Sequence, residues 1–401
     1  MRTTVFLLCA ALITASNAQV VSHSVSHLAD SAKIILGAEQ IKEYLPLLEG
    51  KNVALVANQT SLIGKTHLAD TLLSLKVKIK IAFAPEHGFR GEAEAGETIA
   101  GSTDSKTGIK IISLYGDRKK PSATDLEGID VVVFDIQDVG VRFYTYISTM
   151  QYVMEACAEQ NKTFIVLDRP NPNGYYVDGP VMEDKLRSFV GRTPIPLVHG
   201  LTVGEYATML NGEQWLDGKL KCNLVVVRLK NYTHSVYYSL PVPPSPNLPN
   251  MSSIYLYPSL GLFEGTAISL GRGTEFPFQV IGFPGFNGGS YSFTPKSIPG
   301  KAVHPPYEGI ECKGYMLKDF GDVFVRNSKT IYLFWLKGMY DKYPDHKKFF
   351  NSYFDKLAGT ASLREQIING ASEEEIRKSW QPALDKYKML RQKYLLYPDF
   401  E

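Results

Sequence analysis

The chain has 401 residues, and its 43 lysines and arginines nearly balance its 41 aspartates and glutamates, for a formal net charge of +2. This balance argues against a nucleic-acid-binding protein, which would need a basic surplus. Hydrophobic residues make up 44% of the chain, charged residues 21% and aromatic residues 11%. These fractions exclude a disordered protein, and the length predicts two or three domains, or one large domain with a satellite.

The first residues have the pattern of a targeting signal. Arg2 is followed by an apolar run over residues 5–13 and by Ser16-Asn17-Ala18, a small-x-small cleavage sequence. The pattern predicts a secretory signal peptide over residues 1–18, with a mature chain that starts near Gln19 and is periplasmic or secreted. The apolar run is too short to span a bilayer and no later run is longer, so no membrane span is expected.

Short apolar runs then alternate with segments of helical periodicity. In chain order the expected elements are strand 52–57, helix 66–76, strand 79–84, a surface loop over 90–108, strand 109–114, strand 130–134, helix 145–160, strand 163–167, helix 202–216 and strand 223–229. The strands are almost continuously hydrophobic, which is typical of strands covered on both faces. The alternation predicts an α/β fold with a Rossmann-like, mainly parallel sheet flanked by helices.

A proline-rich stretch divides the chain. Five prolines lie within residues 241–249, which excludes a helix or a central strand there. We therefore expect a domain boundary or a long crossover between about residues 220 and 250, with a Rossmann-like domain over residues 19–225 and a smaller C-terminal α/β domain over residues 226–401.

The rest of the second half predicts loops and a final helix. Residues 257–290 are rich in glycine and aromatic residues and are expected to form loops around short strands. Ser372 and Glu375 have the spacing of a capping box, which predicts a C-terminal helix that is kinked near Pro382.

Three cysteines remain in the predicted mature chain, namely Cys157, Cys222 and Cys312. An odd number argues against a dense disulfide framework. One bridge with one free thiol is an alternative, but we favour three buried thiols.

Polar clusters follow four of the predicted strands at their carboxyl ends. They are Asn58-Gln59-Thr60, Pro85-Glu86-His87-Gly88-Phe89-Arg90, the segment from Asp135 to Tyr144, and Asp168-Arg169-Pro170-Asn171. In an open parallel sheet, ligands bind beyond the carboxyl ends of the strands. One such cluster could be a helix cap or a turn, whereas four along one edge favour a functional site.

Glu86 is the leading candidate for catalysis. It follows a buried strand and Pro85, so loss of hydration would raise its pKa and keep it protonated as a general acid. Asp135 or Asp138 could supply the second carboxylate that glycoside hydrolysis usually needs. The alternative is structural: Glu86 would then be a carboxylate paired with Arg90 or Arg142.

A glycine-rich segment in the second half holds Glu264, Arg272 and Glu275. Arg272 could bind a carboxylate and the two glutamates could accept sugar hydroxyls, or the three could form a structural network. The chain lacks His-Glu-x-x-His, paired Cys-x-x-Cys, Gly-x-Ser-x-Gly and Gly-x-Gly-x-x-Gly motifs. We therefore expect no metal, no serine nucleophile and no dinucleotide cofactor.

Several long motifs in the same order resemble those of the NamZ/YbbC-like exo-β-N-acetylmuramidases, from about residue 35 to the C-terminus. They are Pro85-Glu86-His87-Gly88-x-Arg90-Gly91, Asp135-Ile136-Gln137-Asp138-Val139-Gly140-x-Arg142-Phe143-Tyr144-Thr145-Tyr146, Asp168-Arg169-Pro170-Asn171-Pro172, Phe263-Glu264-Gly265-Thr266 and Gly271-Arg272-Gly273-Thr274-x-Phe276-Pro277-Phe278. The resemblance implies an exo-acting glycosidase that releases N-acetylmuramic acid from the non-reducing end of peptidoglycan fragments, with the family's catalytic glutamate at Glu86. It also implies that the site lies in a cleft between the Rossmann-like domain and the smaller C-terminal domain.

The resemblance and the residue chemistry together give a set of expected site residues. Glu86, Asp138 and Asp135 are expected to be catalytic, unless the substrate's 2-acetamido group is the nucleophile and an aspartate orients it. The expected substrate-binding residues are Asn58, His87, Arg90, Gln137, Arg142, Tyr144, Tyr146, Asp168, Arg169, Asn171, Glu264, Arg272 and Glu275. Arg142, Arg90 or Arg272 would bind the lactyl carboxylate, and Tyr144, Tyr146 or Phe278 would face the pyranose ring.

Two other functions remain open at this point. A peptidoglycan-fragment-binding protein without turnover would use the same polar edge. An esterase or deacetylase acting on the same polymer would need a serine nucleophile or a metal, and neither motif is present.

Overall fold

The computed structural model describes residues 33–91 and 102–400, and the predicted signal peptide lies outside them. The chain separates into Met1–Lys33 and Ile34–Glu401, and the second unit holds every helix and strand described below. The predicted boundary at residues 225/226 stays a prediction; it falls inside a strand of the large sheet, β9.

Seven strands form the large sheet, in the order β5-β6-β4-β1-β7-β8-β9. Their bounds are β1 Asn52–Ala57, β4 Lys78–Ala84, β5 Ser102–Thr103, β6 Lys110–Ser113, β7 Val131–Asp135, β8 Thr163–Leu167 and β9 Asn223–Val227. All neighbours pair in parallel except the edge strand β5, which is antiparallel to β6. The α/β fold with a mainly parallel sheet is therefore confirmed.

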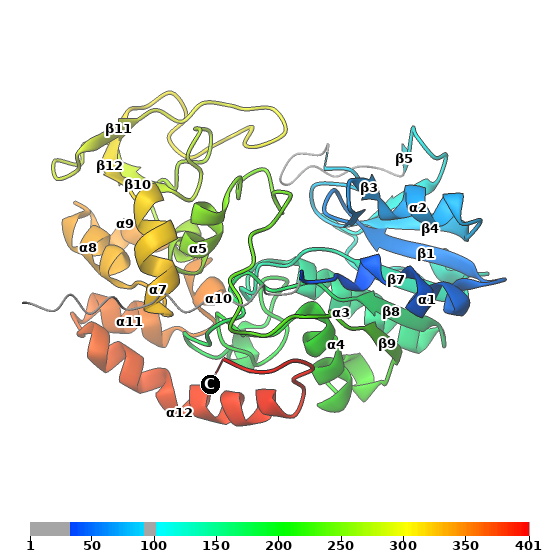
Figure 1. The fold of residues 1–401 in the computed structure, drawn as a ribbon. Helices are drawn as coiled ribbons and strands as arrows, with labels where there is room; N and C mark the ends of the chain where they lie inside the picture. The colour runs from blue at the N-terminus through cyan, green and yellow to red at the C-terminus, as the bar shows by residue number, and fades with distance from the viewer. Residues whose placement is uncertain (1–32, 92–101, 401) are drawn as a thin grey trace, which may run out of the picture. The chain divides into compact units, whose positions relative to one another are not determined.

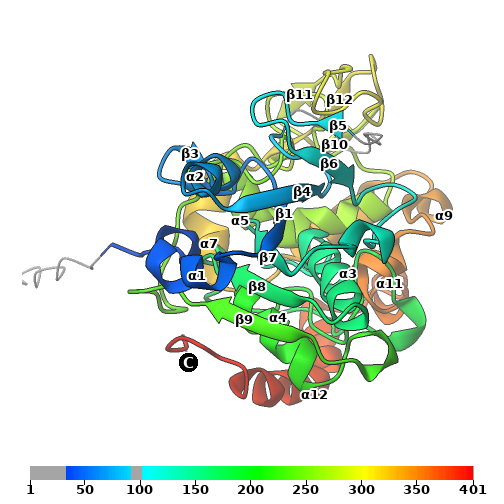
Figure 2. The ribbon, with the colours of Figure 1, turned by 90° about the vertical axis from the view of Figure 1, so that its right-hand side faces the viewer.

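Helices cover both faces of this sheet (Figure 2). They are α1 Ile41–Leu48 and α2 Leu68–Ser74 on one face and α3 Tyr146–Glu159 and α4 Val203–Gly212 on the other. Along β1, Val53 and Leu55 pack in the core with α1 and α2, whereas Ala54 and Val56 pack in the core with α3 and α4. This alternation explains why the strands are hydrophobic throughout.

The second half adds a small sheet and a set of helices (Figure 1). The sheet has the order β10-β12-β11, with β10 Val280–Phe283, β11 Tyr291–Phe293 and β12 Cys312–Met316, all antiparallel. The helices are α5 Met251–Leu260, α6 Lys318–Phe320, α7 Arg326–Ser328, α8 Phe334–Lys342, α9 His346–Phe349, α10 Phe354–Ala358, α11 Ser362–Ile368 and α12 Glu373–Gln392, and a two-stranded hairpin, β2 Leu62–Ile63 with β3 Thr66–His67, precedes α2.

Helix α5 corrects the expectation of loops from residue 257 onward. The helix runs to Leu260 and contains Pro258, which cannot donate a backbone hydrogen bond to Ile254 four residues earlier. The Ile254 carbonyl instead accepts a hydrogen bond from Asn173 Nδ2 at 3.2 Å. A side chain from the other half of the chain thus satisfies the group that the proline leaves open.

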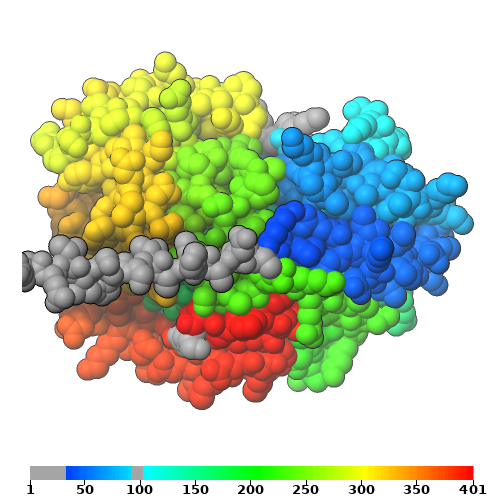
Figure 3. All heavy atoms as spheres, viewed as in Figure 1, coloured from blue at the N-terminus to red at the C-terminus, as the bar shows by residue number. Residues whose placement is uncertain are grey.

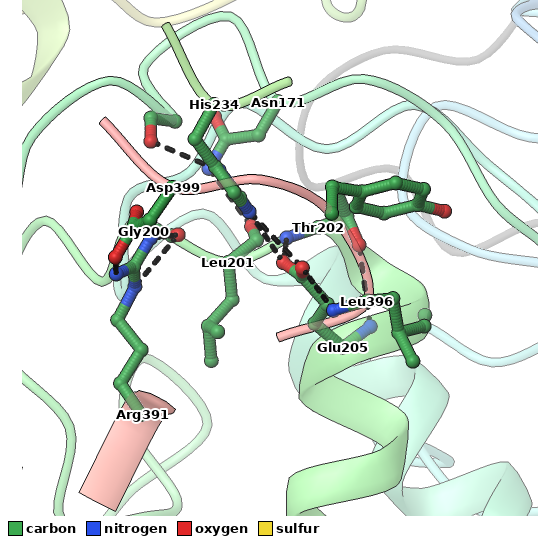
Figure 4. A network of polar contacts seen from close by, with 12 residues as sticks. Asn171, Gly200, Leu201, Thr202, Glu205, His234, Arg391, Leu396 and Asp399 are labelled. Atoms are coloured by element: carbon green, nitrogen blue, oxygen red, sulfur yellow. Dashed lines mark hydrogen bonds and ion pairs between the residues drawn. The ribbon is translucent and has the colours of Figure 1, made fainter. Parts of the chain in front are cut away.

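The predicted C-terminal helix is confirmed as α12, and its capping box is formed by Ser372 and Glu375. After α12 the chain returns to the sheet half, as Figure 4 shows. Arg391 donates to the Gly200 carbonyl at 2.7 Å, and the Leu396 amide donates to Glu205 of α4 at 2.8 Å. His234 also contacts Glu205, at 3.0 Å.

The three cysteines of the described chain are free and buried, as predicted. Among residues 33–91 and 102–400, no helix has the length and apolarity to cross a membrane.

Candidate active site

A pocket of about 370 Å³ lies beyond the carboxyl ends of β4 and β7, where residues of the second half close it. Figure 3 shows the green part of the chain that leads to about residue 250 between the blue N-terminal part and the yellow part near residue 300. The lining residues are Glu86, His87, Tyr115, Phe143, Tyr144, Thr145, Phe189, Val190, Ser245, Asn247, Leu248, Tyr257, Glu264, Arg272, Phe278, Tyr353 and Leu357. This volume lies within the range of pockets that bind small molecules.

Glu86 lines this pocket from the turn after β4. Thr145 Oγ1 lies 3.4 Å from Glu86 Oε2, and Tyr115 also hydrogen-bonds to the carboxyl group. The next residue, His87, has a backbone φ of 70°, a left-handed conformation that is uncommon outside glycine. His87 Nε2 lies 3.1 Å from Ser245 Oγ, a contact that joins this turn to the proline-rich segment.

The surroundings of Glu86 hold its pKa above the ordinary value. Burial is the main cause, because it disfavours the charged carboxylate, and the negative charge of Glu264 adds to it. Hydrogen bonds from Tyr115 and Thr145 and the positive charge of Arg272 act in the opposite direction. The net effect favours a protonated carboxyl group, which is the form that can donate a proton.

Arg272 and Glu264 form an ion pair on the other side of the pocket. Arg272 donates to Glu264 Oε1 at 2.5 Å, and its guanidinium lies 4.9 Å from the centroid of the Phe278 ring. Both side chains are about one-quarter exposed, at 27% and 24%. The pair is therefore accessible from the pocket. The hydrogen bond to Glu264 uses one of the five N–H donors of the guanidinium group, so others are left to bind a ligand.

Aromatic rings form much of the remaining wall. Tyr144 and Tyr257 pack edge to face at 5.9 Å, and Phe278 packs against Tyr257 at 5.0 Å. Tyr146 lies behind Tyr144, and both hydroxyls donate to the Pro244 carbonyl, at 3.2 and 2.9 Å. The two tyrosine hydroxyls thus hold the proline-rich segment at the carboxyl edge of the sheet. Tyr144 also lines the pocket.

Asp135, one of the expected catalytic carboxylates, lies outside the pocket. It is fully buried and accepts two hydrogen bonds from Arg169, at 2.5 and 2.9 Å. Both residues are therefore used within the protein interior, and neither lines the cavity. This placement corrects the expectation that Asp135 faces substrate and that Arg169 binds it.

Asp138 also lies outside the lining of the pocket. Its Oδ2 accepts a hydrogen bond from the Gly140 amide at 2.6 Å and lies 3.7 Å from His199 Nε2. Gly140 has a φ of 77°, and a Cβ there would lie 2.1 Å from Asn171 Oδ1, so this turn requires glycine. Asp138 thus shapes the turn that precedes the pocket residues Phe143, Tyr144 and Thr145.

Arg142 corrects another expectation. Its guanidinium donates to four backbone carbonyls, those of Pro180, Ile195, Leu357 and Ala358, at 2.7 to 2.9 Å. Only 1% of the residue is exposed. Arg142 therefore ties the sheet half to α10 and has no access to a substrate carboxylate.

The other expected binding residues have structural contacts. Arg90 pairs with Asp70 and Asp104, at 3.0 and 2.6 Å. Asp168 is fully buried, which raises its pKa to about 6, although it accepts hydrogen bonds from Tyr397, Thr202 and the Gly204 amide. Asn58, Gln137, Tyr146, Asn171 and Glu275 also lie outside the lining, the first four buried and the last exposed.

Sequence reasoning missed several residues of the wall. Phe189 and Tyr353 lie in loops far apart in the chain, and no strand end or glycine motif marks them. Tyr115 comes directly after the predicted strand 109–114, so the strand-end rule could have selected it. Thr145 and Ser245 could have been selected, because Thr145 follows the Tyr144 cluster and Ser245 lies in the proline-rich segment. Within the described part of the chain, no three His, Cys, Asp or Glu residues are grouped so as to hold a metal ion.

Comparisons with known proteins match this architecture. Residues 53–252 match the family model of the N-terminal part of the exo-β-N-acetylmuramidase NamZ, and residues 255–397 match the model of its C-terminal part. A peptidoglycan β-N-acetylmuramidase NamZ from Bacillus subtilis (strain 168) is 38% identical over 423 residues, which cover 99% of this chain and 100% of that protein.

Two crystal structures of DUF1343 family proteins from Bacteroides fragilis NCTC 9343 are also similar. One has 46% sequence identity and a TM-score of 0.86, covering 92% of this chain and 100% of the other. The second has 33% identity and a TM-score of 0.77, covering 91% and 99%. The resemblance read from the sequence motifs is thus confirmed over almost the whole length. The chain belongs to the NamZ family of exo-β-N-acetylmuramidases and is a glycoside hydrolase.

Proposed function

We propose that Glu86 is the general acid/base with which this chain releases N-acetylmuramic acid from the non-reducing end of peptidoglycan fragments. The observation that carries the proposal is the placement of Glu86. It is the one expected catalytic carboxyl group that lines the pocket of about 370 Å³, and burial raises its pKa. The family relationship, with a relative named as a peptidoglycan β-N-acetylmuramidase, supports the choice of substrate.

In the proposed reaction the Glu86 carboxyl group donates its proton to the glycosidic oxygen as the bond to the anomeric carbon breaks. As the leaving sugar departs as an alcohol, the oxygen of the substrate's 2-acetamido group forms a bond to the anomeric carbon, and Glu86 becomes a carboxylate. That carboxylate then takes a proton from a water molecule whose oxygen attacks the anomeric carbon and displaces the acetamido oxygen, which releases N-acetylmuramic acid and protonates Glu86 again. Burial of Glu86 beside the aromatic wall of Tyr144, Tyr257 and Phe278 raises its pKa, which favours the protonated carboxyl group before the substrate binds.

Hydrolysis of an aryl glycoside of N-acetylmuramic acid tests this function. The wild-type protein is expected to release the chromogenic aryl group. Binding of a muramic acid disaccharide without any cleavage would instead support the alternative function, a peptidoglycan-fragment-binding protein without turnover.

Export of the protein is also part of the proposal, and the apolar run before Gln19 supports it. The test is the mass of the chain recovered from outside the cytoplasm, which should correspond to a mature chain that starts near Gln19.

Arg272 is proposed to bind the lactyl carboxylate, because of the three candidate arginines it alone lines the pocket. We expect Arg272→Met to lower kcat/KM for the muramic acid glycoside by about 10- to 100-fold, the scale of a hydrogen bond to a charged group. The loss for the matching N-acetylglucosamine glycoside, which lacks the lactyl group, is expected to be smaller. Equal losses for both sugars would assign Arg272 to general pocket structure.

The pH dependence of kcat/KM is expected to have an alkaline limb set by Glu86, since activity is lost when the raised pKa is passed and the proton leaves. The charge of Glu264 raises this pKa, so Glu264→Gln should lower it and move the alkaline limb to lower pH. Glu275→Gln is the matched control, because Glu275 is exposed and lies outside the pocket. A limb that stays in place in Glu264→Gln would contradict this assignment.

A further inference from the structure

A second cavity of about 320 Å³ adjoins the pocket around Glu86. Its lining residues are Gln151, Tyr152, Arg187, Ser188, Phe189, Arg192, Trp215 and Asp217. Phe189 lines both cavities, so one side chain forms their common wall. Phe189 and Val190 form the tip of a tight turn that is closed by two backbone hydrogen bonds between Ser188 and Gly191, at 3.0 and 3.1 Å.

Three polar atoms around this second cavity are buried and have no hydrogen-bond partner within the described part of the chain. They are Gln151 Oε1, Ser188 Oγ and Arg192 Nε. The same groups are otherwise well held, because Gln151 Nε2 donates to the Trp215 carbonyl at 3.1 Å and Arg192 pairs with Glu155 at 2.9 Å. An unsatisfied buried polar atom destabilises the folded protein, so three of them around one cavity point to a ligand that supplies the missing partners.

Aromatic and charged groups complete the cavity. The Tyr152 and Phe189 rings lie 6.3 Å apart at an interplanar angle of 27°, and the Arg192 guanidinium lies 3.7 Å from the centroid of the Tyr152 ring. Trp215 is half-buried, and Arg187 is exposed at the rim. Flat rings and polar groups that both donate and accept are a combination suited to a sugar, which has apolar C–H faces and a girdle of hydroxyl and amide groups.

We propose that this second cavity is a subsite for a sugar residue on the leaving-group side of the scissile bond. A hydroxyl or acetamido group can donate to Gln151 Oε1, exchange a hydrogen bond with Ser188 Oγ and accept from Arg192 Nε. The inference rests on the proposed function, since a terminal sugar bound beside Glu86 places the next part of the glycan on one side of that pocket. Because Phe189 lines both cavities, the two lie next to each other.

Two substrates separate this inference from the function itself. The aryl glycoside of N-acetylmuramic acid needs only the pocket around Glu86, whereas a tetrasaccharide that begins with the same sugar reaches the second cavity as well. In Ser188→Ala, kcat/KM for the tetrasaccharide should fall by about 2- to 10-fold, the value of one neutral hydrogen bond. Activity on the aryl glycoside should stay within about twofold, and the melting temperature should not fall, because the hydroxyl group has no hydrogen-bond partner among residues 33–91 and 102–400.

Trp215→Ala extends the test to the aromatic group. We expect about a tenfold loss on the tetrasaccharide, with Trp215→Tyr retaining most activity because it keeps a flat ring. Retained activity on the aryl glycoside shows that each variant is folded. If the variants treat both substrates alike, the subsite is wrong and the function of Glu86 stands. If the wild-type protein cleaves neither substrate, the proposed function fails and the subsite fails with it.

Discussion

Glu86→Gln is expected to lower kcat for a muramic acid glycoside by about 100-fold or more, the scale of a lost general acid. Glutamine has nearly the same shape and keeps an oxygen that can accept hydrogen bonds from Tyr115 and Thr145, but it cannot release a proton to the glycosidic oxygen. The measurement is the initial rate of release of N-acetylmuramic acid from a disaccharide, at a pH below the alkaline limb.

The control for this variant is its binding and stability. Because the substitution removes a carboxyl group that burial destabilises in its charged form, the melting temperature should stay the same or rise. The affinity for the disaccharide should change little. An aryl glycoside with a very acidic leaving group should lose much less activity, since its departure needs little protonation. Turnover of the disaccharide at the wild-type rate would remove Glu86 from the mechanism.

Asp135→Ala is expected to cost about 3–5 kcal/mol of unfolding free energy, because it leaves the buried guanidinium of Arg169 without its counter-charge. Both side chains are almost fully buried, at 0% and 3% exposure, and the two hydrogen bonds between them are the main polar contacts of the carboxylate. Denaturant unfolding, followed at constant pH, measures this loss.

A double variant separates the structural role of this pair from a catalytic one. Asp135→Leu/Arg169→Met replaces both charges with apolar groups, so we expect it to be more stable than Asp135→Ala alone. The unfolding free energy of Asp138→Asn provides a comparison from the same segment, since Asp138 has no arginine partner among the described ion pairs. An Asp135→Ala protein that keeps wild-type stability but has lost all activity would show that Asp135 has a catalytic role.

The sequence predicted the sheet well because its strands are buried on both faces. The continuous apolar runs around Val53 and Val132, with helical segments between them, are typical of strands in a parallel sheet that is covered on both faces. The same rule placed Glu86 correctly, since a residue directly after a central strand must lie at the carboxyl edge. Helix α5 was missed because the Ile254 carbonyl that Pro258 leaves without a donor accepts a hydrogen bond from Asn173, a contact across 81 residues that no local pattern reveals.

The site was predicted only in part, for a related reason. Glu86 lies just after β4 and Asp135 is the last residue of β7, yet one lines the pocket and the other faces inward to Arg169. Sequence spacing gives the edge of the sheet but not the direction of each side chain. Arg142 and Arg272 were equally suitable for a carboxylate by chemistry, and only the four carbonyls around Arg142 distinguish them.

A crystal structure of the Glu86→Gln protein with an uncleaved disaccharide that begins with N-acetylmuramic acid is the most direct test. The account predicts that the terminal sugar fills the pocket between the turn after β4 and Arg272, with the position-86 side chain about 2.6–3.2 Å from the glycosidic oxygen. A disaccharide bound elsewhere, or a glycosidic oxygen beyond the reach of that side chain and of one bridging water, would contradict it.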